Sequence, residues 1–229
     1  MARTRARART AAFVVATSIA AALGLTSCAS PATAFHLVGA TPATSKVNAG
    51  ELQLFAGTYT FAADSSGDVG DLRWTVTYGN VLFPGANPVA TADGVASTTV
   101  DLAPPTGSEK RYYQVCLSSI ANPLARTCQV YVVGADAAMV GQWVFNPFAL
   151  QTTVDARSLH AQLFVLNHVG PALDGPMASP FLFTQTIEDP NGGPSVEVWA
   201  ELVSPWELWL ALPGGPPETG GVLKFIRTA

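Results

Sequence analysis

Glycine and proline interrupt this sequence at short intervals, and the runs between them alternate apolar and polar side chains. The chain has 229 residues, with 20 Gly and 17 Pro, and typical runs are GELQLFAG at 50–57 and LRWTVTYG at 72–79. Because successive side chains of a strand point to opposite faces, these runs predict half-buried strands. Hydrophobic residues make up 48% of the chain and charged residues only 12%, which favours a packed protein over a disordered one. We therefore expect an all-β fold.

The strand signals fall into two units. Residues 47–134 contain several of them at roughly ten-residue spacing, with Trp74 in a middle strand, which indicates a β-sandwich. Residues 135–229 form a second β-rich unit, which we judge too short for an eight-stranded barrel. We expect a smaller β-sandwich or a partial β-barrel there. Residues 28–46 are small, polar and proline-bearing, as is typical of a tether, with an edge strand around 35–38.

The segment 155–168 has two readings. Leu159, Leu163 and Leu166 recur at helical intervals, which is typical of one short helix. Read as a strand, alternate residues from Leu159 to Val165 form one apolar face. The segments around it are strand-like, so we favour the strand.

Two cysteines lie in β-rich runs on either side of the turn ANPLA at 121–125. If these runs pair as a hairpin with Cys116 opposite Cys128, then Tyr113 lies opposite Tyr131 and both sulfurs share one face. We expect a disulfide, which closes a loop of about a dozen residues and stabilises the fold by about 3 kcal/mol. The pair is not expected to bind a metal, because its spacing is not C-x-x-C.

The stretch VEVWAELVSPWELWLALP at 196–213 predicts a hairpin with one apolar face. A three-residue loop keeps the apolar side chains together, sets Trp199 opposite Trp209 and sets Glu201 opposite Glu207. These four residues are the candidates for a surface that binds a sugar ring or another protein. The alternative is that another strand or the first unit covers this face, and the Trp pair is then ordinary cross-strand packing.

Signs of catalysis are missing from the sequence. It contains no G-x-S-x-G, H-E-x-x-H, Walker loop or dinucleotide fingerprint. His160 and His168 are too far apart, on a strand or on a helix, to share a metal ion. Glu201 and Glu207 as a catalytic carboxylate pair would require a cleft, which nothing in the sequence indicates. We expect no enzyme activity, no cofactor and no metal.

The N-terminus has the form of an export signal. A head with four arginines precedes an apolar stretch at 11–25, which is short for a membrane-spanning helix of about 20 residues. The stretch ends in Leu25-Thr26-Ser27-Cys28, which resembles the lipobox of bacterial lipoproteins. The resemblance implies removal of residues 1–27, acylation of Cys28 and attachment to a membrane. The alternative is ordinary secretion, with cleavage after Ala32-Thr33-Ala34.

Removal of residues 1–27 changes the charge balance. It removes four Arg and no acidic residue, which leaves 8 Lys+Arg against 16 Asp+Glu and a net charge of −8. Such a chain is a poor partner for nucleic acid or anionic lipid surfaces. Attachment to the cell membrane or the outer membrane, on the extracytoplasmic side, would therefore come from the lipid. That location also suits the cysteine pair, because disulfides persist in oxidising compartments.

Two further resemblances concern the fold. The order of Trp74, Asp93-Gly94-Val95-Ala96 and Tyr113 resembles a bacterial immunoglobulin-like domain, which implies a sandwich with Tyr113 in the tyrosine-corner role. The disulfide departs from that family, because it would join neighbouring strands. Gly141-Gln142-Trp143 with the late Arg227 resembles the G-x-W strand and terminal arginine of the lipocalins.

Together these features predict a non-catalytic lipoprotein of the cell envelope, which acts in binding or scaffolding through a β surface. Its expected partners are the membrane, through the N-terminal lipid, and an envelope protein or a glycan. The alternatives are a carbohydrate-binding module, or a carrier of a lipid or small ligand in the second unit.

Overall fold

The computed structural model describes residues 34–64, 69–80, 82–166, 168–188, 192–213 and 221–228. The expected signal and lipid-bearing Cys28 lie outside these residues. The described residues form strands β1 to β17 and one 3-10 turn, η1 Val69–Asp71. The prediction of an all-β protein is therefore confirmed.

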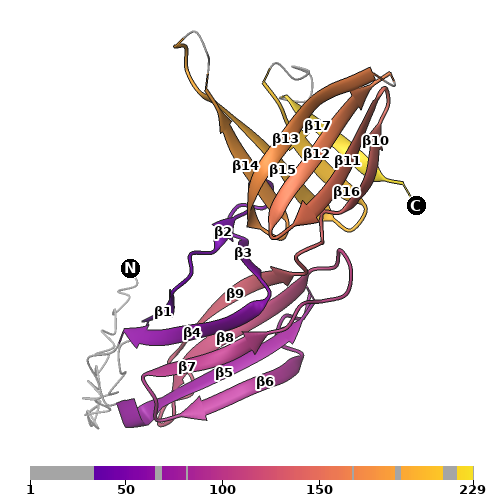
Figure 1. Cartoon of the computed structure of the whole chain (residues 1–229). Coiled ribbons are helices and arrows are strands. Elements are labelled where there is room, and N and C mark those ends of the chain that lie inside the picture. The colour runs from indigo at the N-terminus through magenta and orange to yellow at the C-terminus, as the bar shows by residue number, and fades with distance from the viewer. Residues whose placement is uncertain are drawn as a thin grey trace, which may run out of the picture.

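The first unit consists of two sheets (Figure 1). One sheet has the order β1–β4–β7, with β1 Ala34–Val38, β4 Gly57–Asp64 and β7 Ser97–Leu102. The other has the order β2–β3–β9–β8–β5–β6, with β2 Ala43–Thr44, β3 Leu52–Phe55, β5 Leu72–Gly79, β6 Asn87–Asp93, β8 Arg111–Ser119 and β9 Arg126–Gly134. β3 runs parallel to β9, and the other neighbours are antiparallel.

The two sheets share one apolar core. Phe61 of the first sheet and Trp74, Val115 and Val133 of the second are at most 1% exposed and belong to the same cluster. Alternate residues of each strand point to this core, as the period of two in the sequence predicted. The two sheets therefore pack face to face.

The predicted disulfide hairpin is confirmed. β8 and β9 pair with Cys116 opposite Cys128 and Tyr113 opposite Tyr131. The two sulfurs are bonded at 2.11 Å. The side chain of Arg126 lies over the bridge, with its Nε donating to Cys128 Sγ at 3.1 Å.

The folded part begins before residue 47. β1 pairs with β4, and the Phe35 ring packs edge-on against Phe61 and Trp74, at centroid distances of 6.3 and 5.5 Å. Residues 34–46, expected to be part of a tether, therefore belong to the first unit. The edge strand expected around 35–38 is present as β1.

The second unit is a closed barrel of eight antiparallel strands, β10 to β17 in chain order (Figure 1). Its strands are β10 Gly141–Phe145, β11 Phe148–Asp155, β12 Ser158–Val165, β13 His168–Ser179, β14 Leu182–Ile187, β15 Val196–Ser204, β16 Glu207–Ala211 and β17 Val222–Arg227. β10 closes the barrel by pairing with β17, where Trp143 lies opposite Arg227. The expectation of a smaller sandwich or a partial barrel was therefore wrong.

Eight strands fit into residues 141–227 because several of them and their turns are short. β10 and β16 have five residues each, and two-residue turns join several of the hairpins. Closure depends on strand number, tilt and stagger, so chain length alone was a poor argument against it. The Arg227 guanidinium carbon lies 4.3 Å from the centroid of the Trp143 ring, and Nη2 donates to the Ala138 carbonyl at 3.1 Å. Burial lowers the pKa of Arg227 below its ordinary value.

The segment with two readings is a strand. In β12 the side chains of Leu159, Ala161 and Leu163 point into the barrel and are at most 5% exposed. The helical alternative for 155–168 is therefore wrong. The segment forms a strand and not a helix because barrel closure buries the apolar face that a lone strand would leave in water.

Candidate functional site

The hairpin of β15 and β16 carries the residues that we expected to form a binding surface. Its register pairs Trp199 with Ala211 and Glu201 with Trp209, and it shifts between Leu202 and Ser204. The expected opposition of Trp199 to Trp209, and of Glu201 to Glu207, is therefore wrong by two residues. The turn consists of residues 205–206 instead of a three-residue loop, and the bulge between Leu202 and Ser204 keeps the apolar side chains on one face. The predicted separation of faces holds, since the apolar residues that point inward are at most 1% exposed: Val198, Ala200, Leu202, Leu208 and Leu210.

Glu201 points outward from the barrel, yet it is completely buried. The first unit covers it. Its carboxylate accepts hydrogen bonds from the backbone N–H of Lys46 at 2.7 Å, from the N–H of Val47 at 3.0 Å and from Gln53 Nε2 at 3.1 Å. The Ser45 hydroxyl donates a further bond. A buried carboxylate is costly unless donors satisfy it, and here four donors do so.

Further contacts surround this carboxylate, and together with Glu201 we call them the junction. Gln53, itself 1% exposed, accepts a bond at Oε1 from the Ser179 hydroxyl at 2.6 Å. Lys46 Nζ lies 3.0 Å from both carboxylate oxygens of Glu197. The buried Phe181 ring lies against Gly134 at the end of β9. These contacts hold the barrel and the first unit in one arrangement, with β2 and β3 between them (Figure 1).

The other candidate residues of this surface, Trp199, Trp209 and Glu207, make contacts within the barrel. Trp209 Nε1 donates to Glu207 Oε1 at 2.6 Å, and Lys224 Nζ lies 4.0 Å from the centroid of the Trp209 ring. Trp199 is half-buried between Thr184 and Ala211 on the neighbouring strands. The four residues therefore do not form one open surface, because Glu201 is enclosed and one face of the Trp209 ring carries a lysine.

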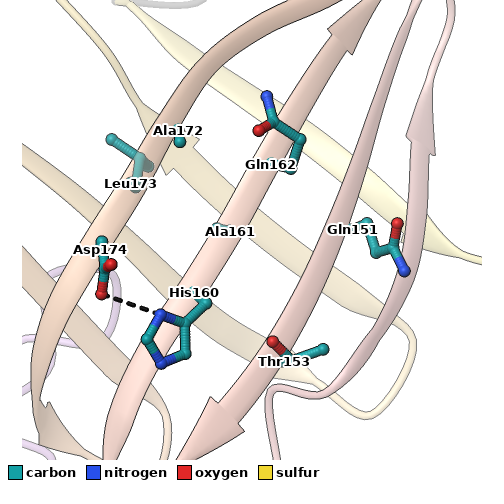
Figure 2. A pocket seen from close by; sticks show the side chains of 8 residues that line it. All are labelled: Gln151, Thr153, His160, Ala161, Gln162, Ala172, Leu173 and Asp174. Carbon is teal, nitrogen blue, oxygen red and sulfur yellow. Dashed lines mark ion pairs between the residues drawn. The ribbon is translucent and has the colours of Figure 1, made fainter.

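A groove of about 250 Å³ lies on another part of the barrel wall, across β11, β12 and β13 (Figure 2). The residues that line it are Gln151, Thr153, His160, Ala161, Gln162, Ala172, Leu173 and Asp174. The register sets its outward side chains in two rows, one of Thr153, His160 and Asp174 and one of Gln151, Gln162 and Ala172. Its polar side chains are mostly uncharged.

The side chains of this groove differ in how they are bonded. His160 Nδ1 lies 2.9 Å from Asp174 Oδ1, which fixes the imidazole ring. Gln162 Nε2 donates to the Gly170 carbonyl at 2.8 Å and to the Leu163 carbonyl at 3.1 Å, at the β-bulge between β12 and β13. Within the part of the chain that the structure describes, no hydrogen bond engages the side chain of Gln151 or Thr153.

The sequence contained a signal for this groove that we did not use. Gln151, Thr153, His160 and Gln162 occupy consecutive outward positions of two strands, and each is polar. Sequence reasoning considered His160 only as a possible metal ligand together with His168. The structure sets these histidines on adjacent strands, and the described residues contain no group of three His, Cys, Asp or Glu that could hold a metal ion.

A second groove, of about 400 Å³, lies on the outer face of the first unit. Tyr112, Cys128, Val130 and Glu51 contribute to its lining. Burial raises the pKa of Tyr112 to about 12, and the nearby Glu51 carboxylate adds to the shift. Glu51 is itself paired with Lys110 at 2.7 Å in a largely enclosed ion pair, so it serves the packing of this region.

No protein-family model matches the sequence, and no curated protein is significantly similar to it. Among the residues described, no helix combines the length and the apolar character needed to cross a bilayer.

Proposed function

We propose that this chain is a non-catalytic lipoprotein of the cell envelope, which binds or scaffolds through the outer surface of its barrel. The observation that carries the proposal is the junction. A fully buried carboxylate with four donors is suited to holding two β units at one angle. Such an arrangement presents the barrel wall in a constant orientation, which is the property a scaffold or receptor needs.

The lipobox resemblance supports an anchor at Cys28, close to the folded part. Residues 29–33 separate Cys28 from β1, and five residues span at most about 18 Å when extended. The first unit then stands next to the membrane and the barrel lies beyond it. The location is extracytoplasmic, on the cell membrane or the outer membrane, and the disulfide Cys116–Cys128 suits such an oxidising site.

For the first unit we propose an immunoglobulin-like sandwich. The buried Trp74 on β5 and the face-to-face packing of the two sheets support this assignment. The Tyr113 hydroxyl donates to the Ala103 carbonyl, just after β7, at 3.0 Å. This contact is similar in form to a tyrosine corner and supports the assignment.

Two alternatives keep specific support. The closed barrel and its Trp143–Arg227 contact favour a carrier of a lipid or small ligand, in line with the lipocalin resemblance. Large side chains fill much of the interior, including the fully buried Phe183 and Phe225, and this counts against a carrier. A carbohydrate-binding module with Trp199 and Trp209 as its platform is the other alternative, although Lys224 occupies one face of Trp209.

The proposal is tested by the mass of the native product. The full-length gene is expressed in a bacterium with lipoprotein processing, and the purified protein and its N-terminal peptide are analysed by mass spectrometry. We expect a chain that begins at an acylated Cys28 and partitions with membranes. The variant Cys28→Ala is the control and should lack the lipid. An unmodified thiol at Cys28 with residues 1–27 still attached would overturn the proposal.

A further inference from the structure

The groove on β11, β12 and β13 (Figure 2) is an open polar site on the barrel wall, and we propose that it binds a sugar unit of an uncharged glycan. This inference rests on the proposed function and names the ligand class of its binding surface. The groove lies on the barrel wall away from β15, the strand whose Glu201 contacts the first unit. The junction therefore leaves it accessible.

The dimensions of the polar array suit one ring of a sugar. Neighbouring strands lie about 4.8 Å apart and alternate residues of one strand about 6.7 Å apart. Two rows on three strands therefore span about 10 Å by 7 Å. Thr153, His160 and Asp174 form one row, and Gln151 and Gln162 belong to the other. A ligand of that width meets side chains of both rows at once.

The available hydrogen-bonding groups are both donors and acceptors. Gln162 uses its Nε2 on backbone carbonyls, which leaves its Oε1 free to accept a bond. His160 is bonded at Nδ1, which leaves Nε2 for a ligand. Gln151 offers an amide and Thr153 a hydroxyl, each able to donate and accept. A sugar hydroxyl also does both, so neighbouring hydroxyls match such an array.

The charge and shape of the groove disfavour other ligand classes. No Lys or Arg is among its lining residues, and Asp174 is acidic, so an anionic ligand would find no counter-charge. Its apolar residues are Ala161, Ala172 and Leu173, and two of these point into the barrel core. The groove therefore lacks a deep apolar pocket for the side chain of a bound peptide or for an acyl chain.

Titration of the purified full-length protein tests the proposal. The probes are uncharged oligosaccharides of glucose, mannose, galactose, arabinose and N-acetylglucosamine, and binding is measured by calorimetry. We expect at least one of them to bind. The variants Gln151→Ala and His160→Ala should each weaken that binding about fivefold, because each removes one hydrogen bond to the ligand. The double variant should weaken binding about 25-fold if the two losses are independent.

Gln142→Ala provides the matched control. Gln142 is an exposed glutamine on β10, directly opposite Gln151, and is not among the residues lining the groove. Its variant should bind as tightly as the unchanged protein. The proposal is overturned if no sugar of the panel binds, or if the control loses as much affinity as Gln151→Ala. It is also overturned if binding is lost only in Trp199→Ala, or if an envelope peptide binds instead of the sugars. The acylation of Cys28 is measured separately, so a failure here leaves the test of the proposed function intact.

Discussion

Two parts of the same barrel wall use polar side chains in opposite ways. On β15, Glu201 points outward and is fully enclosed, with every donor around it supplied by the first unit. On β11, Gln151 and Thr153 also point outward, but no bond to another described residue engages their side chains. A polar residue whose bonds are completed within the chain serves the fold. A row of polar residues that leaves its bonds open has the capacity to bind something else.

The largest expected effect comes from removing the enclosed carboxylate. In Glu201→Ala the N–H groups of Lys46 and Val47 and the Gln53 amide lose their acceptor inside a buried contact. We expect the free energy of unfolding to fall by roughly 3–5 kcal/mol. Urea unfolding of the full-length protein, followed by tryptophan fluorescence, measures this loss. Hydrogen exchange at the amides of Lys46 and Val47 should accelerate in the same variant.

Glu207→Ala is the control for this experiment. Glu207 lies on the adjacent strand and accepts one bond, from Trp209, without being enclosed by the first unit. Its removal should cost about 1 kcal/mol or less. If both variants lowered the free energy of unfolding equally, the enclosed Glu201 would stabilise the protein no more than a surface residue does. That result would contradict the comparison between the covered and the open part of the wall.

An intermediate effect is expected at Gly134, where the first unit meets the lower end of the barrel. An added Cβ would lie 2.3 Å from Cζ of Phe181 and 2.9 Å from Cβ of Pro180. The Phe181 ring is fully buried, so it cannot move aside into solvent. Gly134→Ala should therefore lower the free energy of unfolding by about 2 kcal/mol.

A double-mutant cycle sharpens this second prediction. If the cost arises from the Phe181 ring, then Gly134→Ala combined with Phe181→Leu should cost less than the sum of the single variants. Strict additivity in urea unfolding would show that the close approach of Gly134 and Phe181 is not what couples the units.

Sequence reasoning succeeded where the determining contacts are local. The disulfide register follows from two runs on either side of one turn, and the strand at 158–165 follows from alternating apolar residues. The inward face of β15 and β16 was also predicted, because the parity of a hairpin depends only on neighbouring residues. Predicting these elements required no information about the rest of the chain.

Sequence reasoning failed where a distant segment decides the outcome. Glu201 was a candidate for a binding surface, with coverage by the first unit as the other reading, and the local pattern could not decide between them because Glu201 binds residues 45–53, about 150 positions away. The Trp199–Trp209 pairing was missed because the turn lies at residues 205–206 and not at 203–205, and the bulge beside it is not visible in the local pattern. Barrel closure was missed because it depends on the pairing of β10 with β17, the two ends of the unit.

The smallest effects are expected in the open groove, and they complete the comparison. Gln151→Ala removes a side chain without an internal partner, so the free energy of unfolding should change by less than about 0.5 kcal/mol. Gln162 lies in the same row, but Gln162→Ala removes the bonds from Nε2 to the Gly170 and Leu163 carbonyls at the bulge. This loss should lower the free energy of unfolding by about 1 kcal/mol. Urea unfolding of both variants distinguishes the two roles within one groove. If Gln151→Ala cost as much as Gln162→Ala, the Gln151 side chain would be supporting the fold, and the distinction between a covered and an open part of the wall would no longer hold.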